Sequence, residues 1–116
     1  MKRAILIASS EFSADSGIET LRFPVNDVNA MESTLCSDDF GFEVKKLINE
    51  DRSLVTERLE EWISEADYED LVLIYFSGHG KLDRAGELYL TCANTREGRL
   101  WCRATIWMRT AAAIRV

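Results

Sequence analysis

The only histidine of the chain, His79, stands between two glycines in the segment Ser77-Gly78-His79-Gly80. This segment directly follows residues 71–76, the most hydrophobic run of the sequence. Glycine on both sides permits close approach of other backbone and leaves the imidazole uncovered. Because histidine titrates near neutral pH, it could act here as a general base, and the amide of Gly80 could donate to a developing oxyanion. The spacing fits a turn histidine without chemical duty equally well.

Short apolar segments predict the strands that must position this histidine. Residues 4–8 and 71–76 are continuous apolar runs, which are typical of strands covered on both faces of a parallel sheet. A shorter strand is expected around Phe42 and Val44. Gly86 separates two short segments, 81–82 and 87–90, which favour a small hairpin.

Two amphipathic helices are predicted between the strands. Asn26 or Asp27 can cap the first helix, and Ser53 can cap the second. The apolar positions of both helices recur at helical spacing, at Val28, Met31 and Leu35 in the first and at Val55, Leu59, Trp62, Ile63 and Ala66 in the second.

The alternation of strand, helix, strand, helix and strand predicts two right-handed crossovers. The expected fold is an α/β protein, a three-layer α/β/α sandwich with a mostly parallel sheet. Ligands of such sheets bind beyond the carboxyl ends of the strands. We therefore expect residues 9–27 and residues 77–80, which follow the first and third strands, to lie side by side.

Composition and charge restrict the class of protein. The chain has 116 residues, of which 47% are apolar and 29% charged, so one globular core is expected. No apolar run approaches the ~20 residues of a membrane helix, and the start does not resemble a signal peptide, so we expect a cytoplasmic protein without membrane contact. The net charge of −6 argues against a nucleic-acid partner.

The order of these motifs resembles the amino-terminal portion of caspase-like cysteine peptidases, closest to metacaspases and their bacterial relatives. The resemblance covers residues 4–90, about three-quarters of the chain. The matching segments are, in order, residues 4–8, Asn26-Asp27-Val28, residues 40–44, residues 70–80 and residues 86–90.

The resemblance implies a Cys-His dyad that hydrolyses peptide bonds through a thioester. His79 matches the catalytic histidine of the family, and Gly80 matches the residue whose amide helps to form the oxyanion hole. Asp27 and Ser77 match residues that line the pocket for the residue before the cleaved bond. A carboxylate in that pocket favours cleavage after Arg or Lys. Arg22 is the one basic candidate for the opposite specificity, and Asp27 could also serve as a helix cap.

The family's nucleophilic cysteine normally ends the next parallel strand, ~40–50 residues after the histidine. None of the three cysteines has this place. Cys92 follows the hairpin, Cys102 lacks a flanking glycine or acid, and Cys36 is expected on the packing side of the first helix. We expect all three to be small buried hydrophobes rather than a nucleophile or a disulfide framework.

Metal ligands are not expected. Zinc is disfavoured, because one histidine and three distant cysteines lack ligand spacing. Some metacaspases respond to calcium, so a site from Asp15, Asp83 and Glu87 is conceivable, but scattered acids on an acidic surface are usually solvated. No cofactor is predicted, and the expected partner is a peptide or protein substrate.

We expect the chain to divide into residues 1–97, a partial caspase-like domain, and residues 98–116, a basic tail. Residues 1–97 hold all 20 acids, and the four arginines beyond them form either part of a terminal helix or an altered end of the domain. A short sheet leaves an edge unpaired, so self-association is expected.

We consider three hypotheses for the function of the chain. The first is a cysteine endopeptidase domain that lacks a recognisable nucleophile and is inactive alone. The second is a pseudoenzyme or protein-interaction module on the same fold. A phosphoacceptor receiver domain is disfavoured, because Ser9-Ser10 and Ser77-Gly78 stand where acidic residues would be needed.

Overall fold

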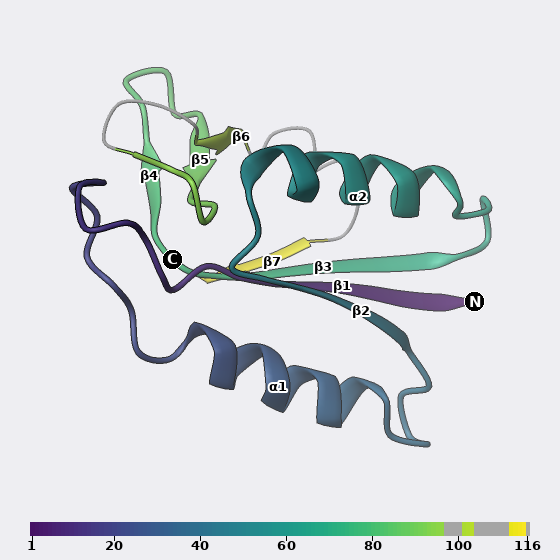
Figure 1. Cartoon of the computed structure of the whole chain (residues 1–116). Coiled ribbons are helices and arrows are strands. Elements are labelled where there is room, and N and C mark those ends of the chain that lie inside the picture. Colours follow the sequence, from purple (N-terminus) through teal and green to yellow (C-terminus); the bar gives the residue numbers. More distant parts are fainter. Residues whose placement is uncertain (97–100, 104–111, 116) are drawn as a thin grey trace.

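A four-stranded parallel sheet forms the centre of the protein (Figure 1). The computed structural model describes residues 1–96, 101–103 and 112–115. The strands lie in the order β2-β1-β3-β7. Their bounds are Glu43–Ile48 for β2, Lys2–Ala8 for β1, Leu71–Ser77 for β3 and Ala112–Arg115 for β7. The predicted apolar runs therefore became the two inner strands, β1 and β3.

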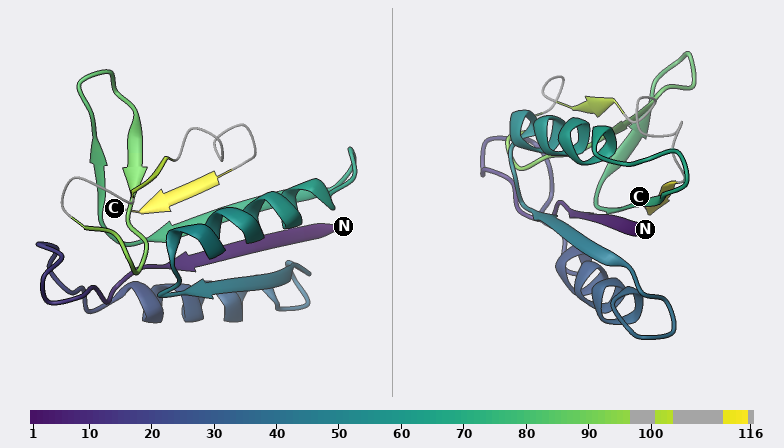
Figure 2. Two further views of the ribbon diagram at one scale, coloured as in Figure 1. Left: turned by 45° about the horizontal axis from the view of Figure 1, so that its top comes forward. Right: turned by 90° about the vertical axis from the view of Figure 1, so that its right-hand side faces the viewer.

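Helices α1 (Pro24–Leu35) and α2 (Arg52–Ser64) cover opposite faces of this sheet (Figure 2). The cause is the alternation of side chains along β1. Ala4, Leu6 and Ala8 pack towards α1, whereas Ile5 and Ile7 belong to the core on the α2 side. The predicted three-layer α/β/α sandwich with a parallel sheet is confirmed.

The packing faces of both helices follow the predicted spacing. Buried residues of α1 pack in the core between α1 and the sheet, and buried residues of α2 pack in the core between α2 and the sheet. The larger apolar side chains of α2 are partly buried against the core on the α2 side. The buried set is Val28 and Leu35 in α1 and Val55 and Leu59 in α2, with Met31, Trp62, Ile63 and Ala66 partly buried against them.

The predicted start of α1 is wrong. The helix begins at Pro24, and Phe23 is the N-cap residue without a side-chain hydrogen bond. Proline is favoured at the first helical position, since its missing N–H would have no partner there. Asn26 and Asp27 therefore lie within the first turn instead of capping it, and the Asp27 side chain is directed to a different contact.

The predicted cap of α2 is also wrong. Asp51 is the N-cap residue and Arg52 the first helical residue, so Ser53 lies one position inside the helix. The Arg52 amide, one of the donors left over at a helix start, donates to Oδ1 of Asn94 over 2.9 Å. The acceptor for this amide comes from a residue 42 positions away, which no local pattern indicates.

A second, smaller sheet rises from the carboxyl end of β3 (Figure 1). Its strands are β4 (Gly80–Leu82), β5 (Leu88–Leu90) and β6 (Cys102–Arg103), all antiparallel. The predicted hairpin is confirmed, and its turn contains Gly86 with a φ of +81°. Because β4 starts at Gly80, His79 stands at the junction of the two sheets.

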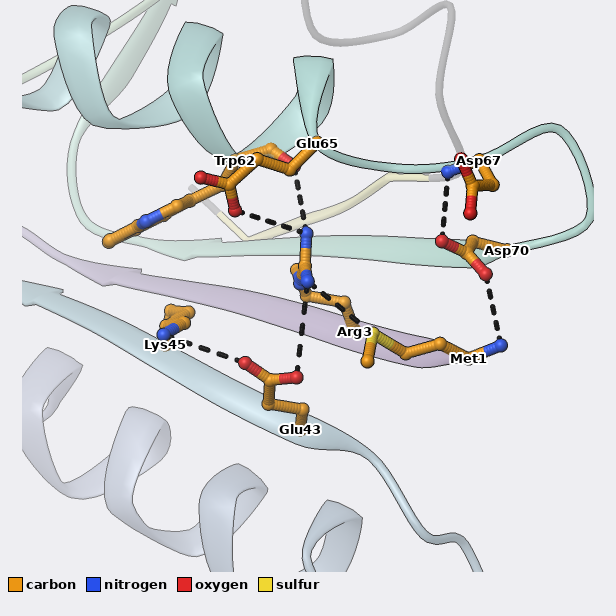
Figure 3. Close-up of polar contacts among 8 residues, drawn as sticks. All are labelled: Met1, Arg3, Glu43, Lys45, Trp62, Glu65, Asp67 and Asp70. Carbon is orange, nitrogen blue, oxygen red and sulfur yellow. Dashed lines mark hydrogen bonds and ion pairs between the residues drawn. The ribbon is translucent and has the colours of Figure 1, made fainter.

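Charged side chains form contacts at the end of the main sheet where β1 begins (Figure 3). Arg3 is buried below the end of α2, where one of its guanidinium nitrogens donates to the Trp62 carbonyl over 3.2 Å. The guanidinium lies 3.6 Å from Glu65 and 3.9 Å from Glu43. A cation here satisfies a carbonyl at a helix C-terminus, and it fixes α2 over the end opposite to His79.

Within residues 98–116, the described residues are Trp101, which belongs to no strand, and two short strands. Residues 102–103 form β6 and residues 112–115 form β7, so neither short segment is helical. The rest of the expected terminal segment, residues 98–100, 104–111 and 116, lies outside the described residues. Neither of the two described helices is long and apolar enough to cross a membrane.

Candidate active site

The loop after β1 and the turn after β3 lie side by side, as predicted. Strand register places Ala8 level with Ser77, and the Ser9 amide donates to the Ser77 carbonyl over 3.0 Å. The contact requires glycine at position 78. A Cβ atom there would lie 2.8 Å from the Ser9 carbonyl oxygen and 2.8 Å from Cζ of Phe76. Gly78 thus lets the two segments approach each other.

Asn49 fixes the beginning of the loop after β1. Asn49 has a φ of +52°, and its backbone N–H donates to the Ala8 carbonyl over 2.9 Å. Its Oδ1 accepts from the amides of Ser10 at 2.8 Å and Glu11 at 3.1 Å. Asparagine tolerates the left-handed conformation better than most residues, so an asparagine directly after a strand was an available signal that the sequence reasoning missed.

The imidazole of His79 is oriented by a main-chain carbonyl. Its Nε2 lies 2.9 Å from the carbonyl oxygen of Glu19, and its ring centroid lies 5.9 Å from that of Phe12. A carbonyl oxygen can only accept a hydrogen bond, so Nε2 must carry a hydrogen. In the neutral ring Nδ1 is then the basic nitrogen. The sequence could not indicate Glu19, because the contact uses its main-chain carbonyl and any residue type could supply it.

The backbone on both sides of His79 is ordered by β5. The His79 carbonyl accepts from the amide of Thr91 at 3.0 Å and from its hydroxyl at 3.1 Å. The hydrogen bond from the Thr91 amide to the His79 carbonyl lies next to the Gly80–Leu90 pair. Gly80 and Leu90 are therefore a non-hydrogen-bonded pair of the antiparallel ladder. The Gly80 N–H is therefore directed away from β5, and the hairpin does not use it.

Asp27 and Ser77 meet beside this histidine turn. The Ser77 hydroxyl donates to Oδ2 of Asp27 over 2.8 Å, which joins the end of β3 to the first turn of α1. Both side chains line a hollow of about 140 Å³. Among the residues whose side chains the structure describes, its lining is Leu21, Arg22, Phe23, Pro24, Asp27, Ser77 and Gly78. The two predicted pocket residues therefore share one concave surface, and Arg22 stands on its wall.

Comparison with known proteins decides the family. A family model described as "Caspase domain" matches residues 1–100. The chain belongs to the caspase domain family. The resemblance inferred from residues 4–90 is thereby confirmed. A search of curated proteins found no match.

In this caspase domain the loop after β1 is also tied to the segment after the hairpin. Nη1 of Arg96 lies 2.9 Å from Oδ1 of Asp15. Hydrogen bonds from the side chains of Ser13 and Arg96, together with the Arg96 charge, hold the pKa of Asp15 below its ordinary value. The ion pair therefore links two segments that are distant in the sequence.

The three acids considered for calcium have separate contacts. Asp15 pairs with Arg96, and Oδ1 of Asp83 accepts the amides of Ala85 and Glu87 within the hairpin turn. The Glu87 carboxylate lies 3.4 Å from Nε of Arg103. Across residues 1–96, 101–103 and 112–115, no three carboxylate, histidine or cysteine side chains gather in the manner of a metal site.

The cysteines of the caspase domain lie in different surroundings. Cys92 is 3% exposed and packs in the core on the α2 side, as predicted. The prediction for Cys36 is wrong: this residue is exposed, because it follows the last turn of α1 and faces away from the sheet core. Cys102 belongs to β6, and its side chain lies outside the described structure.

The resemblance places the family's nucleophile at the end of the next parallel strand after β3, which in this sheet is β7. This strand pairs with β3 in parallel and places Arg115 level with Ser77. It is the next parallel strand of the sheet after β3, and its four residues contain no cysteine.

Proposed function

We propose that this caspase domain supplies the general base, an oxyanion donor and the specificity pocket of a metacaspase-type cysteine endopeptidase that cleaves after Arg or Lys. The observation that carries the proposal is the position of His79. Its Nε2 is held by the Glu19 carbonyl, and the following residue begins the hairpin beside the hollow that contains Asp27.

The proposed chemistry begins with a proton transfer. Nδ1 of His79 takes the proton of the cysteine thiol, and the thiolate adds to the carbonyl carbon of the scissile bond. The Gly80 amide donates to the resulting oxyanion. The imidazolium then returns the proton to the leaving amine as the C–N bond breaks, which leaves a thioester. Water, deprotonated by His79, adds to the thioester and releases the acid and the thiol.

Substrate preference follows from the hollow beside this turn. A guanidinium or ammonium group that enters it meets the Asp27 carboxylate, which the Ser77 hydroxyl holds in position. Charge-assisted hydrogen bonds of this kind are stronger than neutral ones. The exposed Arg22 on the wall is the feature that would favour an acidic residue instead, so the experiment includes both classes of peptide.

We further propose that residues 1–116 alone do not cleave peptides. Cys92 is buried in the core, and Cys36 follows the end of α1 that lies far along the helix from Asp27. A thiol that directly follows β7, or one from a second chain, would lie at the carboxyl end of the sheet with His79. The position of Cys92 and Cys36 away from His79 also favours a second function, a binding module that holds basic peptides without cutting them.

Peptidase activity is tested with fluorogenic peptides that end in Arg, Lys or Asp, each with purified wild type and with His79→Ala. We expect no turnover above that of His79→Ala. Turnover by the wild type that disappears in Cys92→Ala or Cys102→Ala would show an unexpected nucleophile and overturn the proposed inactivity. Addition of calcium to each reaction tests whether a cation is required.

If the gene encodes residues beyond Val116, the longer product separates the two functions. If a cysteine follows β7 there, the peptidase function requires turnover of the Arg and Lys peptides that is lost in His79→Ala. Turnover that is indifferent to His79 contradicts the assigned base. Binding of the same peptides without turnover in the longer product supports the binding module.

A further inference from the structure

A second hollow adjoins His79 beyond the one that contains Asp27. It measures about 270 Å³, and its lining is Gly17, Ile18, Glu19, His79, Gly80 and Trp101. The first hollow lies between residues 21–24 and 77–78, and the second between residues 17–19 and 79–80. The same two segments therefore form both hollows in succession, with the imidazole at the second.

Trp101 gives the second hollow a fixed aromatic wall. Its indole N–H donates to the Arg96 carbonyl over 3.0 Å. The ammonium of Lys81 lies over its ring, 4.4 Å from the centroid. These contacts hold the ring from its edge and from one face. Ile18 contributes a second apolar side chain, and glycine at positions 17 and 80 leaves room between them.

We propose that this second hollow binds an aromatic or large aliphatic side chain that follows the cleaved bond in the substrate. The inference rests on the proposed peptidase function. His79 must reach the nitrogen of the leaving amine to protonate it, so the peptide crosses the imidazole at the scissile bond. If the residue before this bond occupies the hollow of Asp27, the residue after it enters the hollow of Trp101.

The chemistry of the lining decides the class of side chain. An indole ring and an isoleucine favour burial of apolar surface, and aromatic pairs gain from offset or edge-to-face contact. The positive charge of Lys81 already lies over the Trp101 ring, and the Glu19 carbonyl is engaged with His79. Among the described lining residues, the other contributions are glycine backbone and the Glu19 side chain, whose carboxylate could pair with a basic side chain but would repel an acidic one.

The test measures binding of two peptides to the wild-type chain by isothermal titration calorimetry. The peptides are acetyl-Gly-Arg-Phe-Gly-amide and acetyl-Gly-Arg-Gly-Gly-amide, which differ only after the arginine. We expect the phenylalanine peptide to bind about tenfold more tightly, because burial of its side chain removes apolar surface from water. This ratio requires no variant, so it stays informative if a substitution disturbs folding.

Variants then locate the preference. Trp101→Ala should bind both peptides equally, Trp101→Phe should keep part of the preference, and Tyr68→Ala, which removes a fully exposed aromatic residue elsewhere, should keep all of it. Asp27→Asn should lower the affinity for both peptides by the same factor. A circular dichroism melt of each variant confirms that it is folded.

Each remaining outcome overturns a defined claim. Equal affinity of the two peptides in the wild type, or a preference that survives in Trp101→Ala, overturns the second hollow while the Asp27 dependence stands. A third peptide with Asp after the arginine tests the charge: if it binds most tightly, Lys81 rather than Trp101 decides the contact and the inference is wrong. Binding that ignores Asp27→Asn contradicts the proposed function itself.

Discussion

The Ser77 hydroxyl donates a hydrogen bond of 2.8 Å to the Asp27 carboxylate, although 50 positions separate the two residues in the sequence. The bond spans the boundary between the central sheet and the helix layer on its α1 side. It orients the carboxylate at the hollow that also contains Arg22 and Gly78. The Ser77 hydroxyl thus helps to position the charge on which substrate preference is proposed to depend.

Substitution of Asp27 should remove the preference for basic side chains. We expect Asp27→Asn to weaken an arginine-terminated peptide by about tenfold to a hundredfold, since a charge-assisted hydrogen bond is lost. Ser77→Ala should weaken the binding less, because the carboxylate remains and loses only its hydrogen bond from the Ser77 hydroxyl. Calorimetric titration with arginine and norleucine peptides measures both effects, and Asp38→Asn, an exposed carboxylate, is the control. An unchanged arginine affinity in Asp27→Asn would exclude this pocket.

Gly78 is predicted to be intolerant of any side chain. Gly78→Ala places its methyl group 2.8 Å from the Ser9 carbonyl oxygen, so the loop after β1 must shift. The expected cost is about 1–3 kcal/mol of unfolding free energy, measured by urea denaturation. Gly86→Asn is the matched control, because its Cβ has open space and asparagine tolerates a positive φ. Equal stability of the two variants would contradict the steric argument.

The layers of the fold could be predicted because its apolar patterns are local and simple. Continuous apolar runs produced β1 and β3, and helical spacing identified the buried positions Val28, Val55 and Leu59. Parallel connections then require the loops at the carboxyl ends of these strands to meet. For this reason the sequence also predicted the nearness of Asp27, Ser77 and the histidine turn.

The contacts that orient the site could not be predicted in the same way. Glu19 acts through its main-chain carbonyl, and Thr91 reaches His79 only because β5 pairs with β4. The start of α2 depends on Asn94, a residue distant in the sequence. Cys36 was misplaced because a periodic pattern does not state where a helix ends, and one further residue turns the side chain to solvent.

The two cysteines with described side chains should differ in thiol reactivity. Cys36 is exposed at the end of α1, whereas Cys92 is 3% exposed in the core. We expect iodoacetamide to modify Cys36 at least about tenfold faster in the native protein, because Cys92 requires an opening of the structure. Peptide mapping by mass spectrometry follows each site, and denatured protein is the control in which the rates should converge. Rapid native modification of Cys92 would contradict its placement in the core.

Self-association through a sheet edge stays a prediction. Among the described strands of the main sheet, β7 and β2 are the outer two, and we consider β2, which pairs only with β1. It carries Glu43, Lys45 and Lys46, and charged residues on an edge strand disfavour pairing. We therefore expect weak, concentration-dependent association in the wild type and stronger association in Lys45→Ile. Sedimentation velocity at increasing protein concentration measures both. Association that is unchanged in Lys45→Ile would exclude this edge.

The ion pair at the amino terminus should make stability depend on pH in a defined range. Oδ2 of Asp70 accepts the Asp67 amide over 2.8 Å, and Oδ1 lies 3.0 Å from the terminal ammonium of Met1 (Figure 3). These contacts, the Asp67 hydrogen bond first, hold the pKa of Asp70 below its ordinary value of 3.8. A carboxyl whose pKa is lowered on folding stabilises the native state above the unfolded pKa.

This stabilisation is lost as the pH falls through the lower pKa of the folded protein. Asp70→Asn should therefore have a lower Tm than the wild type at pH 7, and the difference should shrink as the pH is lowered past 3.8. Thermal melts across a pH series measure the difference. Asp38→Asn, a substitution of an exposed acid, controls for the change in net charge. A Tm difference that stays constant from neutral to strongly acidic pH would show that Asp70 acts through packing rather than through its charge.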